Sequence, residues 1–380
     1  MRLILVTQDF APEFGGIQTY CLEHAIRLNE LCEDFALICP DKPNSDKVDR
    51  DLDFPVYRFK VNNSLLVFSL FRHLGSIIDK HETDATLHAQ WQTTLPAIAL
   101  RKKSKLNKVF CTGHGRELIY NPYANIPLLG NSFKQLRKKS LQETDHIYPV
   151  SDYTSQLLGK LGVAEERRTI VHNGTTPDKF FPMDALDFKK NKGLEDKKII
   201  LTVTRVVYRK GIDIVIKAIH KLKEKIPDIY YVIVGDGPEI NNCKELVKSL
   251  SLEEHICFVS RVPDEELISY YNICDVFVMV PRSTKTEFEG FGIVYLEANA
   301  CKKPVIGSDS AGIPSAVLHN QTGLLVEEDN IDELTSAINV ILKDQSYATK
   351  LGTNGFERVR SKANWNSVSK KLFDAMDNEL

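Results

Sequence analysis

The stretch TEFEGFGIVYLEANA, Thr286 to Ala300, decides both the fold and the candidate site. Its two glycines permit a turn, and the apolar pattern after them predicts a helix with the sequence GIVYLEANAC. A helix that begins here would offer backbone N–H groups to an anion. The residues of this turn and first helical turn are Gly290, Phe291, Gly292, Ile293 and Val294. Two carboxylates, Glu289 and Glu297, flank them. An ordinary loop before an ordinary helix would look the same, so the rest of the chain has to decide.

Short β-rich apolar runs alternate with helical patterns along the whole chain, which predicts βα units and parallel sheets. The predicted strands are 2–7, 35–40, 108–113 and 146–151, and then 198–205, 230–237, 256–261, 276–281, 304–309 and 322–327. A length of 380 residues favours two domains, and a lysine-rich connection at 182–198 separates the two series. We therefore predict two doubly wound α/β domains, 1–182 and 190–363, facing each other across a cleft.

The composition excludes several classes of protein. A net charge of −2 gives no overall field for nucleic acid, and no apolar run approaches the roughly 20 residues of a membrane span. The start, MRLILVTQDF, is interpreted as a first strand and not as a signal peptide. Eight scattered cysteines without a C-x-x-C pair indicate buried free thiols in a reducing cytoplasm, without a metal site.

The charge is uneven in one region. From Arg101 to Lys139 there are ten Lys and Arg residues and a single acid, Glu117. A solvated helix face would explain this pattern. A patch that faces anionic lipid would explain it equally well, since each cation near such a surface contributes about 1 kcal/mol.

The first domain offers two candidate ligand-binding elements. Gly15 and Gly16 follow the first strand and precede a helix, so the backbone could approach a phosphate there, although a plain turn is the commoner meaning of two glycines. His114 stands between glycines at the end of the strand 108–113. It is either a loop histidine without a role or a polar donor in a tight cleft.

The second domain carries a denser set of cations. Arg205, Arg209 and Lys210 follow the strand 198–205 and precede a glycine. Arginine supplies a planar fork and lysine a point charge, a combination that suits a diphosphate. Together with the helix N-terminus at 291–294 they would offset a pyrophosphate without a metal ion, while the two glutamates accept from hydroxyls. This arrangement indicates a nucleotide-sugar. An NAD site is disfavoured because GDGPE, residues 235–239, lacks the third glycine of that motif.

Taken together, these motifs resemble those of the retaining GT-B glycosyltransferases of family 4, group 1, which include sucrose and glycogen synthases and bacterial lipid mannosyltransferases. The resemblance covers nearly the whole chain. It rests on EGFGIVYLE for the paired glutamates, on Arg205 with Lys210-Gly211, on Gly15-Gly16 and on His114. The segments FGGIQTY, RVVYRKGID and CKKPVIGSDSAG resemble in particular the mannosyltransferases that act on phosphatidylinositol mannosides.

The resemblance implies a GT-B fold and a role for each residue. Glu289 would contact the donor sugar, and Glu297 the ribose. Arg205 and Lys210 would bind the diphosphate, whereas His114 and Gly16 would touch the sugar or the phosphates. The nucleotide base would lie near Arg261 and Val262, and the segment 364–380 would pack back on the first domain.

The implied reaction is a front-face displacement with retention, without a cofactor or a metal ion. The best donor candidate is GDP-mannose, and the acceptor is lipid-linked or a saccharide, which would place the protein in the cytoplasm or at the inner face of its membrane. A UDP-glucose or UDP-N-acetylglucosamine enzyme, a non-catalytic nucleotide-sugar binder and a phosphorylase or epimerase of related fold remain alternatives. The chain departs from the family pattern at Ala311-Gly312 and at Ser315, where Gly-Gly and Glu are common.

Overall fold

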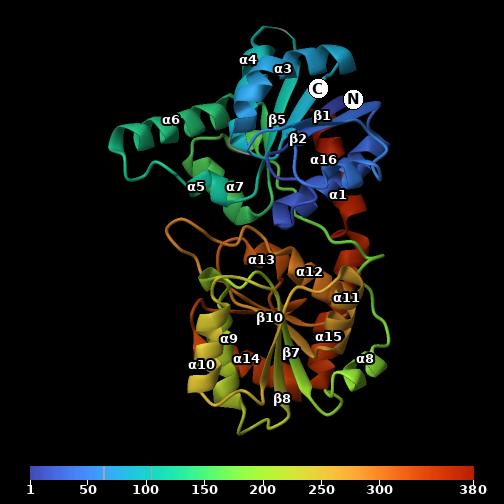
Figure 1. Ribbon diagram of the computed structural model, residues 1–380, viewed down its shortest axis with the longest axis vertical. Coiled ribbons are helices and arrows are strands. Elements are labelled where there is room, and N and C mark those ends of the chain that lie inside the picture. The colour runs from blue at the N-terminus through green and yellow to red at the C-terminus, as the bar shows by residue number, and fades with distance from the viewer. Residues whose placement is uncertain (63–64, 104) are drawn as a thin grey trace. The chain divides into compact units, whose positions relative to one another are not determined.

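The computed structural model describes residues 1–62, 65–103 and 105–380 and divides into two compact units (Figure 1). Unit 1 comprises Met1–Asn173 and Trp365–Leu380, and unit 2 comprises Gly174–Asn364. Each unit holds a six-stranded sheet whose neighbouring strands all run parallel. The prediction of two doubly wound parallel sheets is confirmed.

Unit 1 has the strand order β3-β2-β1-β4-β5-β6. Its strands are β1 (Arg2–Val6), β2 (Asp34–Pro40), β3 (Val56–Phe59), β4 (Ala85–His88), β5 (Lys108–Gly113) and β6 (His146–Pro149). Its α-helices are α1 (Gly16–Leu31), α2 (Ser45–Asp49), α3 (Leu66–His81), α4 (Thr94–Arg101), α5 (Arg116–Ile119), α6 (Pro127–Glu143), α7 (Asp152–Lys160) and α16 (Trp365–Asp377). Leucines at every fourth position of α3 pack on the apolar residues of β1 and β2, because residues four apart share one helix face: Leu66, Leu70 and Leu74.

Two strands of unit 1 are absent from the sequence prediction. β3 lies at the edge of the sheet and all four of its residues are only half-buried. β4 is fully buried but carries Thr86 and His88, whose side chains hydrogen-bond each other at 3.0 Å. Neither segment therefore shows the apolar run or the clean alternation that marked the other strands.

The last helix, α16, belongs to unit 1. Trp365, Val368, Leu372 and Met376 lie on one face of it and are buried, as the helical spacing requires. α16 lies beside α1, where Ser369 Oγ and His24 Nδ1 are 2.9 Å apart (Figure 1). The chain thus returns to its first sheet at its end.

Unit 2 has the strand order β12-β11-β10-β7-β8-β9. Its strands are β7 (Lys198–Val203), β8 (Ile229–Val234), β9 (Ile256–Val259), β10 (Val276–Met279), β11 (Val305–Ser308) and β12 (Gly323–Val326). Its α-helices are α8 (Leu186–Asn191), α9 (Ile212–Leu222), α10 (Ile240–Ser249), α11 (Asp264–Ile273), α12 (Ile293–Ala300), α13 (Ile313–Ala316), α14 (Ile331–Lys343) and α15 (Gln345–Ser361). Each predicted strand of the second half lies on one of these six strands.

The chain passes into unit 2 between Asn173 and Gly174, ahead of the connection at 182–198 where the sequence placed the boundary. The reason is that the intervening segment packs on unit 2. Phe180 is buried with its ring 5.5 Å from that of Tyr271, and Lys179 forms an ion pair with Asp264 at 2.7 Å. Among the described residues, no helix combines the length and the apolar character that a membrane crossing requires.

Candidate functional site

The candidate site of unit 2 lies where the order of its sheet reverses. β7 and β10 are hydrogen-bonded neighbours, with Ile200 opposite Val276, although they are far apart in the chain. Helices leave from the carboxyl ends of these two strands to opposite sides of such a sheet, and ligands of open α/β sheets bind at this crevice. The loop after β7 carries the three predicted cations, and the loop after β10 leads to Glu289 and α12.

The loop after β7 is held by three glycines. Gly211 has φ +70°, and a Cβ there would lie 2.0 Å from the carbonyl oxygen of Val280. A Cβ at Gly235 would lie 2.0 Å from the Thr204 oxygen, and one at Gly237 would lie 2.1 Å from that of Val206. The GDG sequence therefore lets the backbone after β8 pack against the loop that carries Arg205.

Arg209, Lys210 and Glu289 form a compact ion cluster. The Glu289 carboxylate accepts from Lys210 Nζ at 2.6 Å and from Arg209 Nη1 at 2.8 Å. The Lys210 and Glu289 side chains are only 11% and 15% exposed. Burial alone would raise the pKa of Glu289, but the two cations lower it to about 2, so the carboxylate is ionised at neutral pH. Burial lowers the pKa of Lys210, and Glu289 opposes that change.

Arg282, which was not predicted from the sequence, stabilises the turn that carries this cluster. Its side chain is 5% exposed, donates to Asp213 at 3.0 and 3.1 Å and to Asp329 at 2.8 Å, and stacks on the Tyr208 ring at 4.2 Å. The Arg282 side chain also donates to the Tyr208 carbonyl, and the backbone N–H of Arg282 donates to the Arg209 carbonyl at 2.8 Å. These contacts fix the turn from which Arg209 and Lys210 project.

The Gly-Phe-Gly turn forms as expected. Gly292 has φ +92° and is the N-cap of α12, with no side chain capping the helix. The N–H groups of Ile293 and Val294 therefore lack partners inside the helix, as at any helix N-terminus. The Tyr295 N–H donates to the Gly292 carbonyl at 3.2 Å. Phe291 is buried and anchors the turn.

The loop between β11 and α13 binds the backbone of this turn. The Gly312 N–H donates to the Glu289 carbonyl at 3.0 Å, and a Cβ at Gly312 would lie 1.8 Å from the Gly290 oxygen. Ala311 has φ +49°, a conformation that glycine adopts more easily, which is a physical reason for glycine to be common at this position. Gly312 is thus required by the backbone of the site.

The remaining predicted residues of unit 2 are placed separately. Arg205 is exposed, and no ion pair of its side chain is found in the described part of the chain. Glu297, on α12, accepts from the Tyr271 hydroxyl at 2.6 Å, and burial raises its pKa. Arg261 is exposed and Val262 is half-buried after β9, where the Arg261 N–H donates to Asp236 at 3.2 Å.

Unit 1 brings its two candidate elements to the carboxyl ends of β1 and β5. Gly16 begins α1, and a Cβ there would meet nothing within 4 Å, so the packing of unit 1 does not require glycine. Gly15 precedes it as the N-cap. His114 is buried, its Nε2 lies 2.9 Å from Thr112 Oγ1, and burial lowers its pKa to about 3, so the imidazole is neutral at pH 7.

Glu117 holds the His114 loop and was noted in the sequence only as the one acid of the basic region. Its carboxylate accepts from the N–H of His114 at 2.6 Å and from that of Gly115 at 3.0 Å. An acid three residues after a loop histidine, in the first turn of a helix, is the local signal that could have found it.

Several cations of the basic region 101–139 have partners within unit 1; position 104 lies outside the described residues. Arg101 pairs with Asp145, Lys102 with Glu143 and Lys105 with Asp79, and the buried Arg137 donates to the Tyr120 carbonyl. All four of these contacts lie within unit 1. Among the exposed lysines of α6, Lys139 lies 3.9 Å from Glu143, the carboxylate that also pairs with Lys102.

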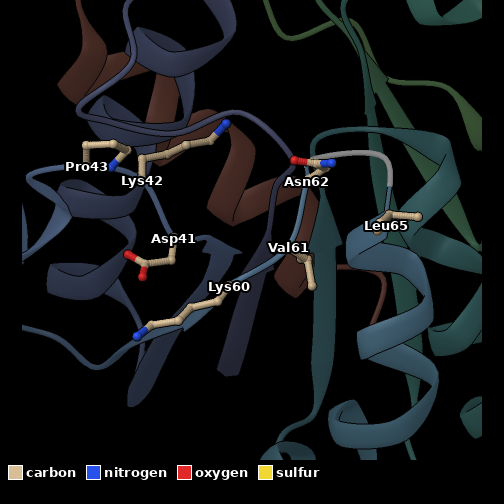
Figure 2. A pocket seen from close by; sticks show the side chains of 7 residues that line it. All are labelled: Asp41, Lys42, Pro43, Lys60, Val61, Asn62 and Leu65. Carbon is tan, nitrogen blue, oxygen red and sulfur yellow. The ribbon is translucent and has the colours of Figure 1, made fainter.

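Unit 1 also carries a hollow of about 600 Å³ that the sequence did not predict. It lies beyond the carboxyl ends of β2 and β3, lined by Asp41, Lys42, Pro43, Lys60, Val61, Asn62 and Leu65. Figure 2 shows the amino groups of Lys42 and Lys60 pointing apart, and Lys42 pairs with Glu13 at 2.9 Å. The hollow therefore presents no convergent charge to a ligand.

Family models match both halves of the chain. Residues 14–179 match the model described as Glycosyltransferase Family 4, and residues 184–358 match Glycosyl transferases group 1. The two matched segments together span most of units 1 and 2.

Relatives align along the whole chain. A protein of Mycolicibacterium smegmatis named GDP-mannose-dependent alpha-(1-6)-phosphatidylinositol monomannoside mannosyltransferase is 26% identical, with 98% of each chain covered. A Corynebacterium glutamicum protein named for the monoacylated form of the same lipid is 27% identical, covering 100% of this chain and 98% of its own. The crystal structure of Anabaena Alr3699/HepE in complex with UDP aligns with a TM-score of 0.84 at 17% identity, over 100% of both chains, which shows the fold alone. The chain belongs to the glycosyltransferases of group 1 and family 4, with the GT-B fold.

Proposed function

We propose that this glycosyltransferase moves a hexosyl group, best assigned as mannose from GDP-mannose, to a lipid-linked or saccharide acceptor with retention and without a metal ion. The observation that carries the proposal is the ion cluster of Arg209, Lys210 and Glu289 beside the uncapped N-terminus of α12. Cations and free N–H groups suit a diphosphate, and a carboxylate held at the same place suits sugar hydroxyls. The names of the full-length relatives support GDP-mannose and a glycolipid acceptor.

The ionisation states of the site define what its residues do. With a pKa of about 2, Glu289 is neither a general acid nor a general base at neutral pH, and it acts as a hydrogen-bond acceptor for the donor sugar. His114 is neutral and acts as a hydrogen-bond donor or acceptor. Glu297 would accept from the ribose, Arg261 and Val262 would lie near the base, and Gly15 and Gly16 would leave room for the donor.

The transfer then follows a front-face displacement. The bond between the anomeric carbon and the phosphate oxygen breaks, the acceptor oxygen bonds to the same face, and the acceptor proton passes to the leaving phosphate. Arg205, Lys210 and the N–H groups of α12 stabilise the charge that grows on the diphosphate, and a preorganised group of this kind is typically worth about 10²–10³ in rate. The reaction would take place in the cytoplasm, at the inner face of a membrane where the acceptor is a lipid.

The first experiment is a thermal-shift panel of GDP, UDP, ADP and their common sugars, with EDTA and with Mg²⁺. A nucleotide at 100 times its Kd adds about 2.7 kcal/mol of stability, which is a shift of a few degrees. We expect stabilisation by GDP and GDP-mannose without metal, followed by transfer of radiolabelled mannose to a lipid extract. Stabilisation by UDP compounds alone would favour the UDP-sugar alternative, and stabilisation by GDP without any transfer would favour a non-catalytic binder.

Two matched variants test whether the thermal shift caused by nucleotides arises at the proposed site. Arg205→Ala removes an exposed cation beside the cluster, and Lys225→Ala removes an exposed cation beyond the far end of α9. We expect a tenfold or larger loss of nucleotide affinity only in Arg205→Ala, with both melting temperatures near that of the wild type. Equal responses of the two variants, or no response to any nucleotide, would overturn the proposed site.

A further inference from the structure

Buried aromatic rings of unit 1 connect the last helix, α16, with His114. The centre of the Tyr20 ring lies 4.5 Å from that of the His114 ring at an angle of 83°, and 4.2 Å from that of His24. The Trp365 ring lies 6.0 Å from Tyr20 at 82° and 5.3 Å from His24 at 75°. Edge-to-face contacts of this kind are a preferred geometry of packed rings. We call Tyr20, His24 and Trp365, which are at most 1% exposed, the ring support of His114.

The ring support is built from both ends of the chain. Tyr20 and His24 are four residues apart on α1 and therefore share one face of that helix. Trp365 is the first residue of α16, and Ser369, one turn later, lies with its Oγ 2.9 Å from His24 Nδ1. Tyr20 is thus packed between His114 and the helix that returns to unit 1.

The other contacts of His114 do not fix the plane of its ring. Gly113 and Gly115 flank it, and Glu117 binds only its backbone N–H. The side chain makes a single hydrogen bond within the described part of the chain, between Nε2 and Thr112 Oγ1 at 2.9 Å. One hydrogen bond leaves the imidazole free to tilt about that contact. A packing contact is needed as well, and Tyr20 supplies it.

The same hydrogen bond defines which nitrogen of His114 is available to a ligand. The Thr112 hydroxyl donates to the Ala89 carbonyl at 3.3 Å. Because a hydroxyl carries one proton, Thr112 accepts from His114 Nε2–H. Burial lowers the pKa of His114 to about 3, so the ring is neutral at pH 7 and its Nδ1 carries a lone pair. Nδ1 is therefore an acceptor, which suits the hydroxyl of a sugar.

Tyr20 acts on His114 through its ring and not through its hydroxyl. The hydroxyl is buried and has no hydrogen-bond partner among the residues that the structure describes. Burial raises the pKa of Tyr20 and lowers that of His24 to about 3, so neither is charged at pH 7. What Tyr20 offers to His114 is an uncharged ring, which phenylalanine would reproduce.

We propose that Tyr20 is a positioning residue for His114, and that it holds the imidazole with Nδ1 available to a hydroxyl of the donor sugar. The inference deepens the proposed function and rests on it for the sugar, whereas the contact between the two rings does not depend on it. A Tyr20 that only stabilised unit 1 would affect melting but not the use of the sugar. Kinetics and stability therefore separate the two roles.

Transfer kinetics with GDP-mannose and a lipid extract test the proposal. A small misplacement of a contacting group can cost up to about 10²-fold in rate, so we expect Tyr20→Leu to lower kcat/KM by about tenfold or more. Tyr20→Phe keeps the ring and should stay within about twofold of the wild type. A loss in Tyr20→Phe as large as that in Tyr20→Leu would overturn the proposal.

Phe35→Leu is the matched control for the loss of a buried ring. Phe35 is 2% exposed and lies near the amino end of β2, whereas His114 follows the carboxyl end of β5. Both leucine variants should lower the melting temperature, because each leaves a cavity in unit 1. Only Tyr20→Leu should lower kcat/KM when both are assayed well below their melting temperatures. Equal kinetic losses would mean a general effect of destabilisation and would refute the positioning role.

A double-mutant cycle tests whether Tyr20 acts through His114. In a His114→Ala background the ring to be positioned is gone, so adding Tyr20→Leu should change kcat/KM by less than about twofold. A further loss of about tenfold would show that Tyr20 acts independently of His114. The affinity for GDP, which lacks the sugar, should be equal in the wild type and Tyr20→Leu by titration calorimetry. A parallel loss of GDP affinity would contradict an action on the sugar contact.

NMR of the histidine rings gives a readout besides activity. In protein labelled with ¹⁵N-histidine, the His114 signals are identified by their absence from His114→Ala. We expect one neutral tautomer, protonated at Nε2, in the wild type and in Tyr20→Phe, and a mixture of tautomers in Tyr20→Leu. An unchanged tautomer in Tyr20→Leu would overturn the proposal. A wild type that does not use GDP-mannose would instead refute the proposed function, while these spectra would still decide whether Tyr20 positions His114.

Discussion

Replacing Glu289 by glutamine tests whether charge holds the buried cluster together. Glutamine keeps the size of the side chain but removes the negative charge that accepts from Lys210 at 2.6 Å and from Arg209 at 2.8 Å. Lys210 would then be a buried cation without its carboxylate, which is strongly destabilising. We expect Glu289→Gln to lower the free energy of unfolding.

The magnitude follows from the pKa of Glu289, which falls from 4.5 to about 2 in the folded chain. Because one pKa unit corresponds to 1.36 kcal/mol, this fall is worth about 3 kcal/mol of stability. The folded pKa lies below the unfolded one, so the stabilisation is complete above about pH 4.5 and is lost as the pH falls toward 2. The difference in the free energy of unfolding between the wild type and Glu289→Gln should become smaller over the same pH range.

The assay is urea unfolding at pH 6, 4 and 3, monitored by far-UV circular dichroism. Trp91 and Trp365 both lie in unit 1, so tryptophan emission reports on that unit separately. Glu287→Gln is the matched control, since the Glu287 carboxylate lies 3.9 Å from Arg209 and its side chain is 39% exposed, against 15% for Glu289. It should cost less than about 0.5 kcal/mol. A stability difference for Glu289→Gln that does not change with pH, or an equal cost for Glu287→Gln, would refute the reasoning.

Three further predictions concern the residues around the cluster. Arg282→Gln should cost about 2 to 3 kcal/mol in calorimetric melts and weaken nucleotide binding, and Arg282→Lys should not restore either, because lysine lacks the fork that reaches both carboxylates. Gly312→Ala should lower kcat at least tenfold in a transfer assay, because its Cβ would displace the Gly290 carbonyl. His114 is neutral above about pH 3, so the pH–rate profiles of wild type and His114→Asn between pH 5 and 8 should have the same shape; an inflection present only in the wild type would contradict this pKa.

Much of the fold follows from the sequence because the buried strands are apolar runs. All six strands of unit 2 were predicted in this way. β4 was not, because Thr86 and His88 satisfy each other only in the folded chain. The return of α16 to unit 1 follows from family resemblance, whereas its contact with α1 depends on pairs such as His24 with Ser369, which no local pattern reveals.

The candidate site could be predicted as a set of residues but not as a geometry. Lys210 and Glu289 stand out through glycines beside them, yet their ion pair joins positions 79 apart in the chain. Arg282 gives no local signal, since its role depends on the carboxylate of Asp213 at the start of α9 and on that of Asp329 in the loop after β12. The ion pairs of Lys102 with Glu143 and of Lys105 with Asp79 could not be predicted for the same reason, because these partners are distant in sequence.

The charge of the proposed donor site bears on the proposal that the transfer proceeds without a metal ion. Arg205 and the cluster cations Arg209 and Lys210 contribute three positive charges, against the negative charges of Glu289 and of Glu287, which lies 3.9 Å from Arg209. One net positive charge therefore remains toward the two charges of the proposed nucleotide-sugar diphosphate. When the sugar departs, one further negative charge develops on the leaving phosphate. The N-terminus of α12, with roughly half a positive charge and no side-chain cap, lies at the end of the same loop as Glu289. In the proposed reaction, stabilisation of the leaving diphosphate would therefore increase as the bond breaks, which is the condition for faster transfer and not merely for tighter binding.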